Sequence, residues 1–215
     1  MNIQFDKVQP KTKEQLKQLI NYAFKHDIYD LNFIDTSKIT NMSWLFENVK
    51  HNFDVSNWDV SNVTYMNGIF NSCFKFKGKG LENWNVSKVK DMYSMFYGCK
   101  KLNCDLSNWD VSNVTNMAYM FNGCTNFKVK GLEHLDVSNV TYMACMFVGC
   151  KKFDCDLSDW DVSNVTDMYS MFTMCENFKG KGLENWDVSK VKNMNYMFAG
   201  CDKITTPKWY KKYNF

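Results

Sequence analysis

Hydrophobic residues recur along this chain at a fixed interval of about 25 residues. Each copy opens with a segment such as WDVSNVT, which starts at Trp58, Trp109 and Trp160, and continues with M-x-x-M-F-x-x-C-x-x-F. One phenylalanine column is present in every copy: Phe46, Phe70, Phe96, Phe121, Phe147, Phe172 and Phe198. Self-similarity at a fixed period of this size indicates a repeat architecture. The pattern therefore predicts seven tandem coils.

The copy at residues 105–129 illustrates the elements that the pattern predicts. Trp109 and Val111 are separated by a polar residue, and this alternation indicates a short strand. A stripe with helical spacing follows: Val114, Met117, Met120 and Phe121. The run is too short for a stable isolated helix, so it predicts one or two turns of α or 3₁₀ helix. Stacked coils would bury one another's apolar sides. The predicted fold class is an α/β solenoid, a leucine-rich-repeat-like stack whose coils each hold a short parallel strand and a short helix.

The two ends of the chain depart from the repeat and are predicted to cover it. Residues 12–25 predict an amphipathic capping helix, with Thr12 and Gln15 in a capping-box pattern. Trp209 and Tyr210 are expected to fold over the last coil. The predicted domains are an N-terminal cap at 1–29, a seven-coil region at 30–204 and a C-terminal cap at 205–215.

A longer period of 51 residues lies over the shorter one. Coils alternate between a DLSNW type of entry and a KGLENW type. The entry positions therefore alternate in charge up the stack: Asp54, Lys79, Asp105, Lys130, Asp156 and Lys181. We hypothesise a ladder of mixed charge that fixes the register of neighbouring coils.

Composition and charge narrow the possible functions. The chain has 215 residues, of which 45% are hydrophobic, and a formal net charge of +3. This net charge is too small to produce the strong positive electrostatic field that favours nucleic-acid binding. No apolar stretch reaches the length of a membrane span, and no secretory signal is visible, which favours a cytoplasmic location. The nine cysteines are expected to be buried thiols rather than a disulfide framework.

The sequence gives little support for a catalytic site or a metal site. The three histidines, His26, His51 and His134, are scattered along the chain. Cys145, Cys150 and Cys155 are spaced by five, unlike the ligands of zinc sites. We therefore expect no enzyme activity, no catalytic residue, no metal site and no cofactor.

A polar row on the predicted strand face is the candidate binding site. It comprises Asp59, Asn85, Asp110, Asp136, Asp161 and Asp187, with His134 and Asp159 at a neighbouring variable position. Like charges one coil apart repel, and two outcomes would relieve this. The carboxylates either accept hydrogen bonds from backbone N–H or serine groups of the turn, or they attract a cation or a basic partner.

The pattern V-x-x-M-x-x-M-F-x-x-C-x-x-F/L followed by L-x-x-W-x-V resembles the BspA-like bacterial leucine-rich repeats. It is most similar to the branch rich in WDVSNVTNM, found in surface-associated and lipoprotein-like bacterial proteins. This resemblance implies adhesion or partner binding, and a cell-surface or secreted location.

The expected function is that of a non-catalytic repeat scaffold that binds a protein or other macromolecular partner, in bacterial adhesion or host interaction. One alternative is a structural or self-assembling module, a monomer or a weak end-to-end oligomer. A second alternative is a glycan-binding protein that uses tyrosines flanking the predicted helices: Tyr65, Tyr93, Tyr119, Tyr142, Tyr169 and Tyr196.

Overall fold

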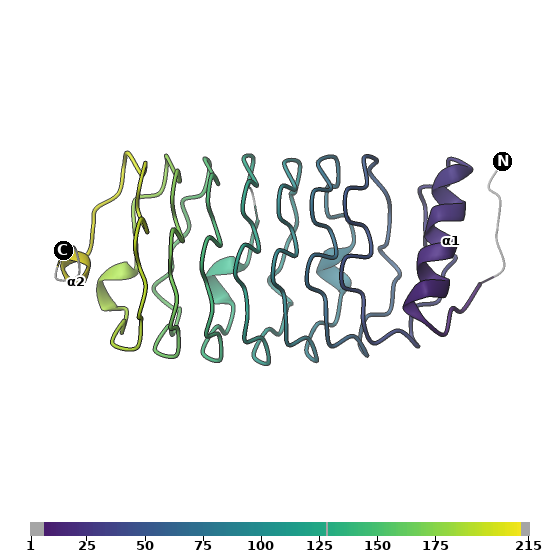
Figure 1. The fold of residues 1–215 in the computed structure, drawn as a ribbon, viewed down its shortest axis with the longest axis horizontal. Helices are drawn as coiled ribbons and strands as arrows, with labels where there is room; N and C mark the ends of the chain where they lie inside the picture. Colours follow the sequence, from purple (N-terminus) through teal and green to yellow (C-terminus); the bar gives the residue numbers. More distant parts are fainter. Residues whose placement is uncertain (1–6, 128, 212–215) are drawn as a thin grey trace.

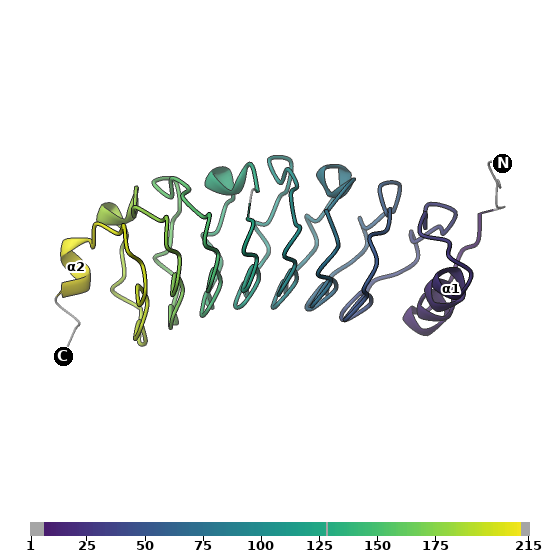
Figure 2. The same cartoon turned by 90° about the horizontal axis from the view of Figure 1, so that it is seen from above.

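The computed structural model describes residues 7–127 and 129–211. Similar coils follow one another along a single axis, so the molecule is elongated (Figure 1). Helix α1, Lys13–Lys25, lies at one end, and the short helix α2, Lys208–Lys211, lies at the other. Three 3₁₀ helices follow the outer side of a shallow curve (Figure 2): η1 at Leu81–Asn83, η2 at Leu132–His134 and η3 at Leu183–Asn185. We number the coils 1 to 7, beginning at residues 33, 58, 84, 109, 135, 160 and 186.

The predicted α/β solenoid of strand-and-helix coils is wrong. Across the described ranges the structure has no strand and no sheet, and neighbouring coils share only isolated parallel bridges such as Asn116 with Tyr142. The segment at 109–111, expected to be a strand, is irregular, and the segment at 115–121, expected to be a short helix, consists largely of turns. The helices α1 and α2 both lie outside the coils.

Each coil is instead a succession of β-turns whose first and fourth residues are apolar. In coil 4, the N–H groups of Val114 and Met120 donate to the carbonyls of Val111 and Met117, at 2.8 and 3.2 Å. A turn brings residues i and i+3 together, as a helix does, so both give an apolar spacing of three. All four of these side chains are buried.

A left-handed residue inside the turns excludes the predicted helix. Tyr119 has φ 60° and Gly123 has φ 74°, each at the third place of its turn. The position of Tyr119 is left-handed in every coil: Trp44, Gly68, Ser94, Tyr119, Cys145, Ser170 and Tyr196. A residue with positive φ at this place gives a type II turn. It also interrupts an α-helix, which needs right-handed φ and ψ at every residue.

The phenylalanine column forms the centre of the core. Consecutive rings are stacked nearly parallel, with centroids 5.5–5.8 Å apart and interplanar angles of 5–10°. Beside them, each thiol of the cysteine column donates to the phenylalanine carbonyl of the coil before it, as Cys124 does to Phe96 at 3.1 Å. The cysteines are therefore buried hydrogen-bond donors as well as small apolar groups.

The WDVSNVT segment serves mainly to attach each coil to its predecessor. Asn113 Nδ2 donates to the Ser87 carbonyl of coil 3 at 2.8 Å, and Trp109 Nε1 donates at 2.8 Å to the carbonyl of Leu81, just before coil 3. Thr115 Oγ1 donates in the same way to Lys90 at 3.3 Å. The motif recurs because stacking requires it in every coil.

The two caps differ in how fully they cover the stack. The side chain of Thr12 accepts a hydrogen bond from the Gln15 N–H and so begins helix α1, which buries Leu16, Ile20 and Ala23. At the other end, Trp209 Nε1 donates to the Leu183 carbonyl at 2.7 Å, as the coil tryptophans do to theirs. The predicted caps also include residues 1–6 and 212–215, which lie outside the described residues.

Candidate functional site

The predicted polar row is a line of closed turns on the surface. Asp110 accepts a hydrogen bond from the backbone N–H of Ser112 at 3.1 Å and from its hydroxyl at 2.6 Å, and these bonds lower the pKa of Asp110. The other members accept the same backbone bond: Asp59, Asn85, Asp136, Asp161 and Asp187. The turns thus explain why this column is nearly always Asp or Asn. Hydrogen bonding within the turn, the first of the two outcomes considered for the row, is present in every member.

The remaining two predicted residues meet on an exposed surface. His134 Nδ1 lies 3.5 Å from Asp159 Oδ2, and these side chains are 67% and 71% exposed. A contact so open to water contributes little binding energy by itself.

The coil entries carry the predicted ladder of mixed charge. Lys79 forms an ion pair with Asp54, and Lys181 forms one with Asp156 at 2.6 Å. The equivalent Asp105 and Lys130 are joined through a backbone bridge. Each pair thus links an aspartate coil to the lysine coil that follows it, within one 51-residue unit.

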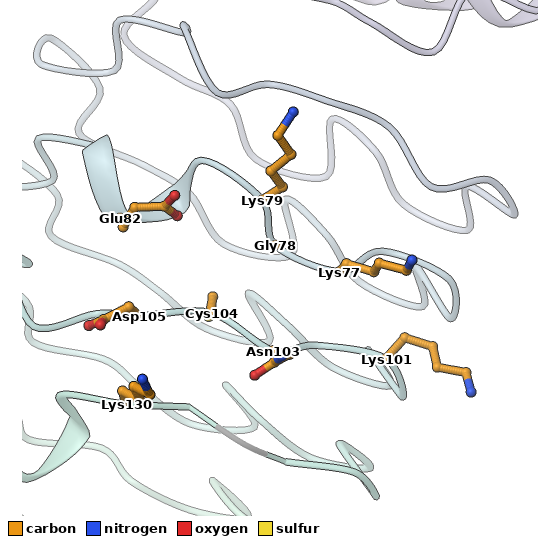
Figure 3. Close-up of a pocket in the computed structure, with 9 residues that line it drawn as sticks. All are labelled: Lys77, Gly78, Lys79, Glu82, Lys101, Asn103, Cys104, Asp105 and Lys130. Carbon is orange, nitrogen blue, oxygen red and sulfur yellow. The ribbon is translucent and has the colours of Figure 1, made fainter.

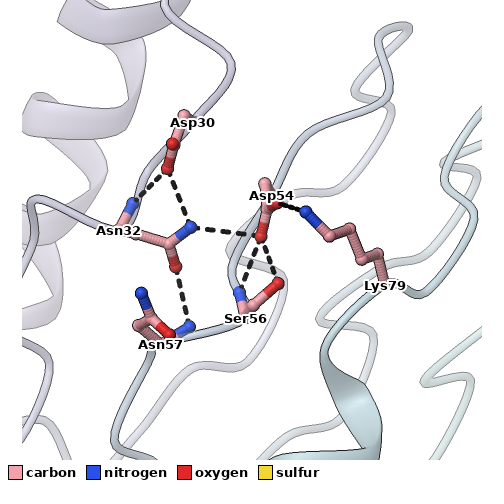
Figure 4. Close-up of polar contacts among 6 residues, drawn as sticks. All are labelled: Asp30, Asn32, Asp54, Ser56, Asn57 and Lys79. Atoms are coloured by element: carbon pink, nitrogen blue, oxygen red, sulfur yellow. Dashed lines mark hydrogen bonds and ion pairs between the residues drawn. The ribbon is translucent and has the colours of Figure 1, made fainter. Parts of the chain in front are cut away.

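The Asp54 pair is part of a larger polar cluster (Figure 4). Asn32 Nδ2 donates to Asp30 at 2.8 Å and to Asp54 at 3.1 Å, while its Oδ1 accepts from the Asn57 N–H at 2.7 Å. Burial opposes ionisation of Asp54, but hydrogen bonds from Lys79, Ser56 and Asn32 hold its pKa well below the usual range. The cluster ties residues before coil 1 to coil 2 and is satisfied internally.

A depression of about 650 Å³ lies next to this edge, between coils 2, 3 and 4. Its lining is Lys77, Gly78, Lys79, Glu82, Lys101, Asn103, Cys104, Asp105 and Lys130. Figure 3 shows that Lys77 and Lys79 point in different directions. The depression is therefore lysine-rich, but its ammonium groups do not converge on one point.

A different surface gathers the exposed aromatic residues. We define the ladder face as four positions in each coil: the residue before the first core Met or its equivalent, the two residues that follow that Met, and the residue after the column phenylalanine. Its tyrosines are Tyr65, Tyr93, Tyr97, Tyr119, Tyr142, Tyr169 and Tyr196. Their backbone is fixed by hydrogen bonds between coils, such as Met117 N–H to the Tyr142 carbonyl at 2.9 Å.

Four of these tyrosines surround one hollow. It measures about 560 Å³ and is lined by Tyr93, Asn116, Ala118, Tyr119, Tyr142, Ala144, Asp167, Tyr169 and Asn193. The rings of Tyr93 and Tyr119 meet edge to face at 5.5 Å. Tyr142 is 52% exposed, and Tyr196, farther along the face, is 64% exposed. A hydrogen bond with Cys145 raises the pKa of Tyr119 to about 12.

Sequence reasoning found part of this surface. Six of its tyrosines were singled out for the glycan-binding alternative, but Tyr97 was missed, although its place directly after the invariant Phe96 marks it as an outward position of the same column. The structure shows that Tyr93, Tyr119, Tyr142 and Tyr169, from coils 3 to 6, line one hollow.

Comparison with known proteins identifies the family. The family model described as "Mycoplasma protein of unknown function, DUF285" matches residues 14–133 and 120–214. These matches span most of the chain, which therefore belongs to this family of bacterial repeat proteins. No curated protein and no solved structure matches it. Within the described ranges, no helix combines the length and apolar character needed to cross a membrane.

Proposed function

We propose that this chain is a non-catalytic repeat scaffold that binds another protein through its ladder face. The observation that supports this is the contrast between two sets of positions. The core and the WDVSNVT segment repeat nearly unchanged because stacking uses them, whereas the ladder-face positions differ from coil to coil. Variable side chains on a rigid, repeated backbone provide specificity without altering the fold.

The composition of the ladder face supports a protein partner. Tyrosine and asparagine are its commonest residues, accompanied by serine, aspartate and one tryptophan, Trp44. Binding surfaces of antibodies use the same combination, because tyrosine supplies contact area at little entropic cost and small polar residues adapt their hydrogen bonds. Edge-to-face pairs such as Tyr169 with Tyr196, at 5.9 Å, turn adjacent rings at an angle of 85° to one another. This arrangement favours an uneven protein surface over the flat face of a sugar ring.

Site-specific photo-crosslinking tests the proposal. A photoreactive phenylalanine analogue at Tyr142 would probe the ladder face, and the same analogue at Asp110 would probe the polar row as a matched exposed control. In extracts of the native source, we expect the Tyr142 probe to give one prominent protein adduct that Tyr169→Ala weakens. Adducts from the Asp110 probe alone would reject the ladder face as the site.

A competition experiment separates protein from glycan binding. If a polysaccharide fraction from the same source removes the adduct at low concentration, the ligand is a glycan and the protein proposal fails. Persistence of the adduct after glycosidase treatment of the extract supports it.

The biological setting is part of the same proposal. The resemblance to BspA-like repeats favours a partner met in adhesion or host contact, with the chain displayed at the cell surface. Protease treatment of intact cells tests this, because an exposed chain is degraded while a cytoplasmic marker protein survives.

A further inference from the structure

The peptide groups that join neighbouring coils along the ladder face all point the same way along the stack. In coil 4 the N–H groups of Met117, Tyr119, Phe121 and Gly123 donate to carbonyls of coil 5, at 2.7–2.9 Å. The carbonyls that precede these N–H groups accept from coil 3, at 2.7–3.0 Å: Asn116, Ala118, Met120 and Asn122. Every coil therefore presents only carbonyls to the coil before it and only N–H groups to the coil after it, at these four positions.

This polarity gives the two ends of the stack opposite character. Aligned peptide dipoles leave partial positive charge where N–H groups are unpaired and partial negative charge where carbonyls are unpaired, as at the ends of an α-helix. The carbonyl end is coil 1, and there α1 supplies a positive charge: the ammonium of Lys17 donates to the Leu45 carbonyl. The core residues Met42, Leu45 and Phe46 of this coil are completely buried.

The N–H end, at coil 7, lacks a comparable cover. Across residues 7–127 and 129–211, the N–H groups of four residues donate to no carbonyl: Met194, Tyr196, Phe198 and Gly200. Met194 and Phe198 remain 8% and 7% exposed, whereas their equivalents in coil 6, Met168 and Phe172, are 0% exposed. A hollow of about 560 Å³ opens here, lined by Asn195, Tyr196, Phe198, Ala199, Ile204, Thr206 and Tyr210.

The same end carries a net positive charge. Residues 186–210 contain four lysines and two aspartates, a formal charge of +2, and the ammonium groups of Lys190 and Lys203 donate to Asn164 and Asn177 of coil 6. The lysine charges and the unpaired N–H groups both favour a partner that is negative and rich in hydrogen-bond acceptors.

We propose that the exposed end of coil 7 docks an extended acidic segment of a partner protein. The N–H donors lie on every second residue of the coil. An extended segment with a carboxylate at every second residue presents a row of acceptors on one side, which suits a row of donors. A second copy of this chain fits less well, because at these four positions the carbonyls of coil 1 lie on the side that α1 covers, where Lys17 donates to the Leu45 carbonyl.

The test uses the full ¹⁵N-labelled chain and two synthetic peptides, DTDTDTD and its neutral counterpart NTNTNTN. We expect the acidic peptide to shift the amide resonances of Met194, Tyr196, Phe198 and Gly200 and to slow their hydrogen exchange. The amides of Met168, Ser170, Phe172 and Met174, already paired in coil 6, serve as internal controls and should not respond.

Charge variants sharpen the result. Lys192→Glu, at the exposed end of coil 7, should weaken acidic-peptide binding by about fivefold, while Lys101→Glu, in the depression between coils 2 and 4, should leave it unchanged. Equal binding of both peptides, or shifts confined to the Lys77–Lys101 edge, would overturn the proposal. A particle mass that rises with protein concentration in the absence of peptide, together with shifts of the four coil 7 amides, would do so as well, since a second copy would then occupy this end.

Discussion

The second left-handed position in each coil is occupied by glycine in four coils and by larger residues in three. The glycines are Gly98, Gly123, Gly149 and Gly200, and the others are Asn48, Ser72 and Met174, with φ values of 58–62°. Residues with a Cβ are strained in this conformation, and glycine is not. The fold therefore requires a left-handed backbone here regardless of the side chain.

Met174→Gly should stabilise the protein by about 0.5–1 kcal/mol, because it relieves left-handed strain that outweighs the added flexibility of the unfolded chain. The Met174 side chain is 58% exposed, so little apolar burial is lost. The matched control is Gly149→Ala, where an added Cβ meets no atom within 4 Å and the cost, about 1 kcal/mol, is that of the backbone alone. Denaturant melts of the two variants should shift in opposite directions, and a destabilised Met174→Gly would contradict the strain argument.

The buried thiols should be unreactive in the native protein. Burial raises the pKa of Cys73 to about 12 and that of Cys201 to about 11, so the reactive thiolate is scarce at pH 8. Titration with a disulfide reagent should label few cysteines before unfolding and all nine afterwards. Cys155, which is only partly buried, should react first. Rapid native labelling of six or more would show that the cysteine column is accessible.

At the scale of the element, the β-turn replaces both predicted elements of the coil. The sequence identified the repeat boundaries, the core columns and the N-terminal helix, predicted at residues 12–25 and found at Lys13–Lys25, because these depend on which side chains are apolar. It did not identify the local backbone. Val114, Met117 and Met120 are three residues apart in the sequence, and this spacing places them on one side of either a helix or a series of turns. The left-handed residue that distinguishes the two backbones is Tyr119, and tyrosine is an unusual residue at a left-handed position.

The same limit applied to the candidate site. Asp110 stands between two buried apolar residues, which suggested an outward strand position, but its carboxylate closes a turn onto Ser112. The ladder face was only partly visible in the sequence, because which tyrosines share a hollow depends on how coils 3 to 6 align in space.

The closed turns make stability sensitive to acid. The pKa values of Asp110 and Asp187 are lowered by hydrogen bonds from serine, and that of Asp156 is lowered to about 2, chiefly by Lys181. An unfolded aspartate has a pKa of about 3.9, so below this pH the unfolded chain binds more protons than the folded one. Stability should therefore be complete above about pH 4 and should fall as the pH drops toward 2.

Denaturant melts between pH 6 and pH 2 measure this loss. Asp110→Asn keeps the turn, as Asn85 does in coil 3, but removes one titrating group. This variant should resemble the parent at pH 6 and lose less stability on acidification. An equal loss in both proteins would mean that the lowered pKa of Asp110 does not contribute.

On the scale of the whole molecule, each coil bonds to the coils next to it, and the tryptophan indoles reach residues just before the preceding coil, as Trp109 does to Leu81. Stability in such a stack is close to a sum of coil and interface terms, so the ends open more readily than the middle. The two ends are not equivalent here. Helix α1 completely buries the core residues of coil 1, whereas Phe198 and Cys201 of coil 7 remain 7% and 9% exposed.

Hydrogen exchange should therefore show opening that begins at coil 7. Trp209→Ala removes the indole bond to Leu183 and part of the cover over coil 7, and we expect it to cost about 1–2 kcal/mol. Because coupling is between neighbours, the faster exchange should be confined to coils 6 and 7, while amides of coils 2 to 4 keep their protection. The matched change at the other end, Leu16→Ala in α1, should accelerate exchange in coil 1 first. Uniform acceleration along the whole stack in either variant would show that the coils unfold as a single cooperative unit. Coil 7 would then not open independently of the other coils.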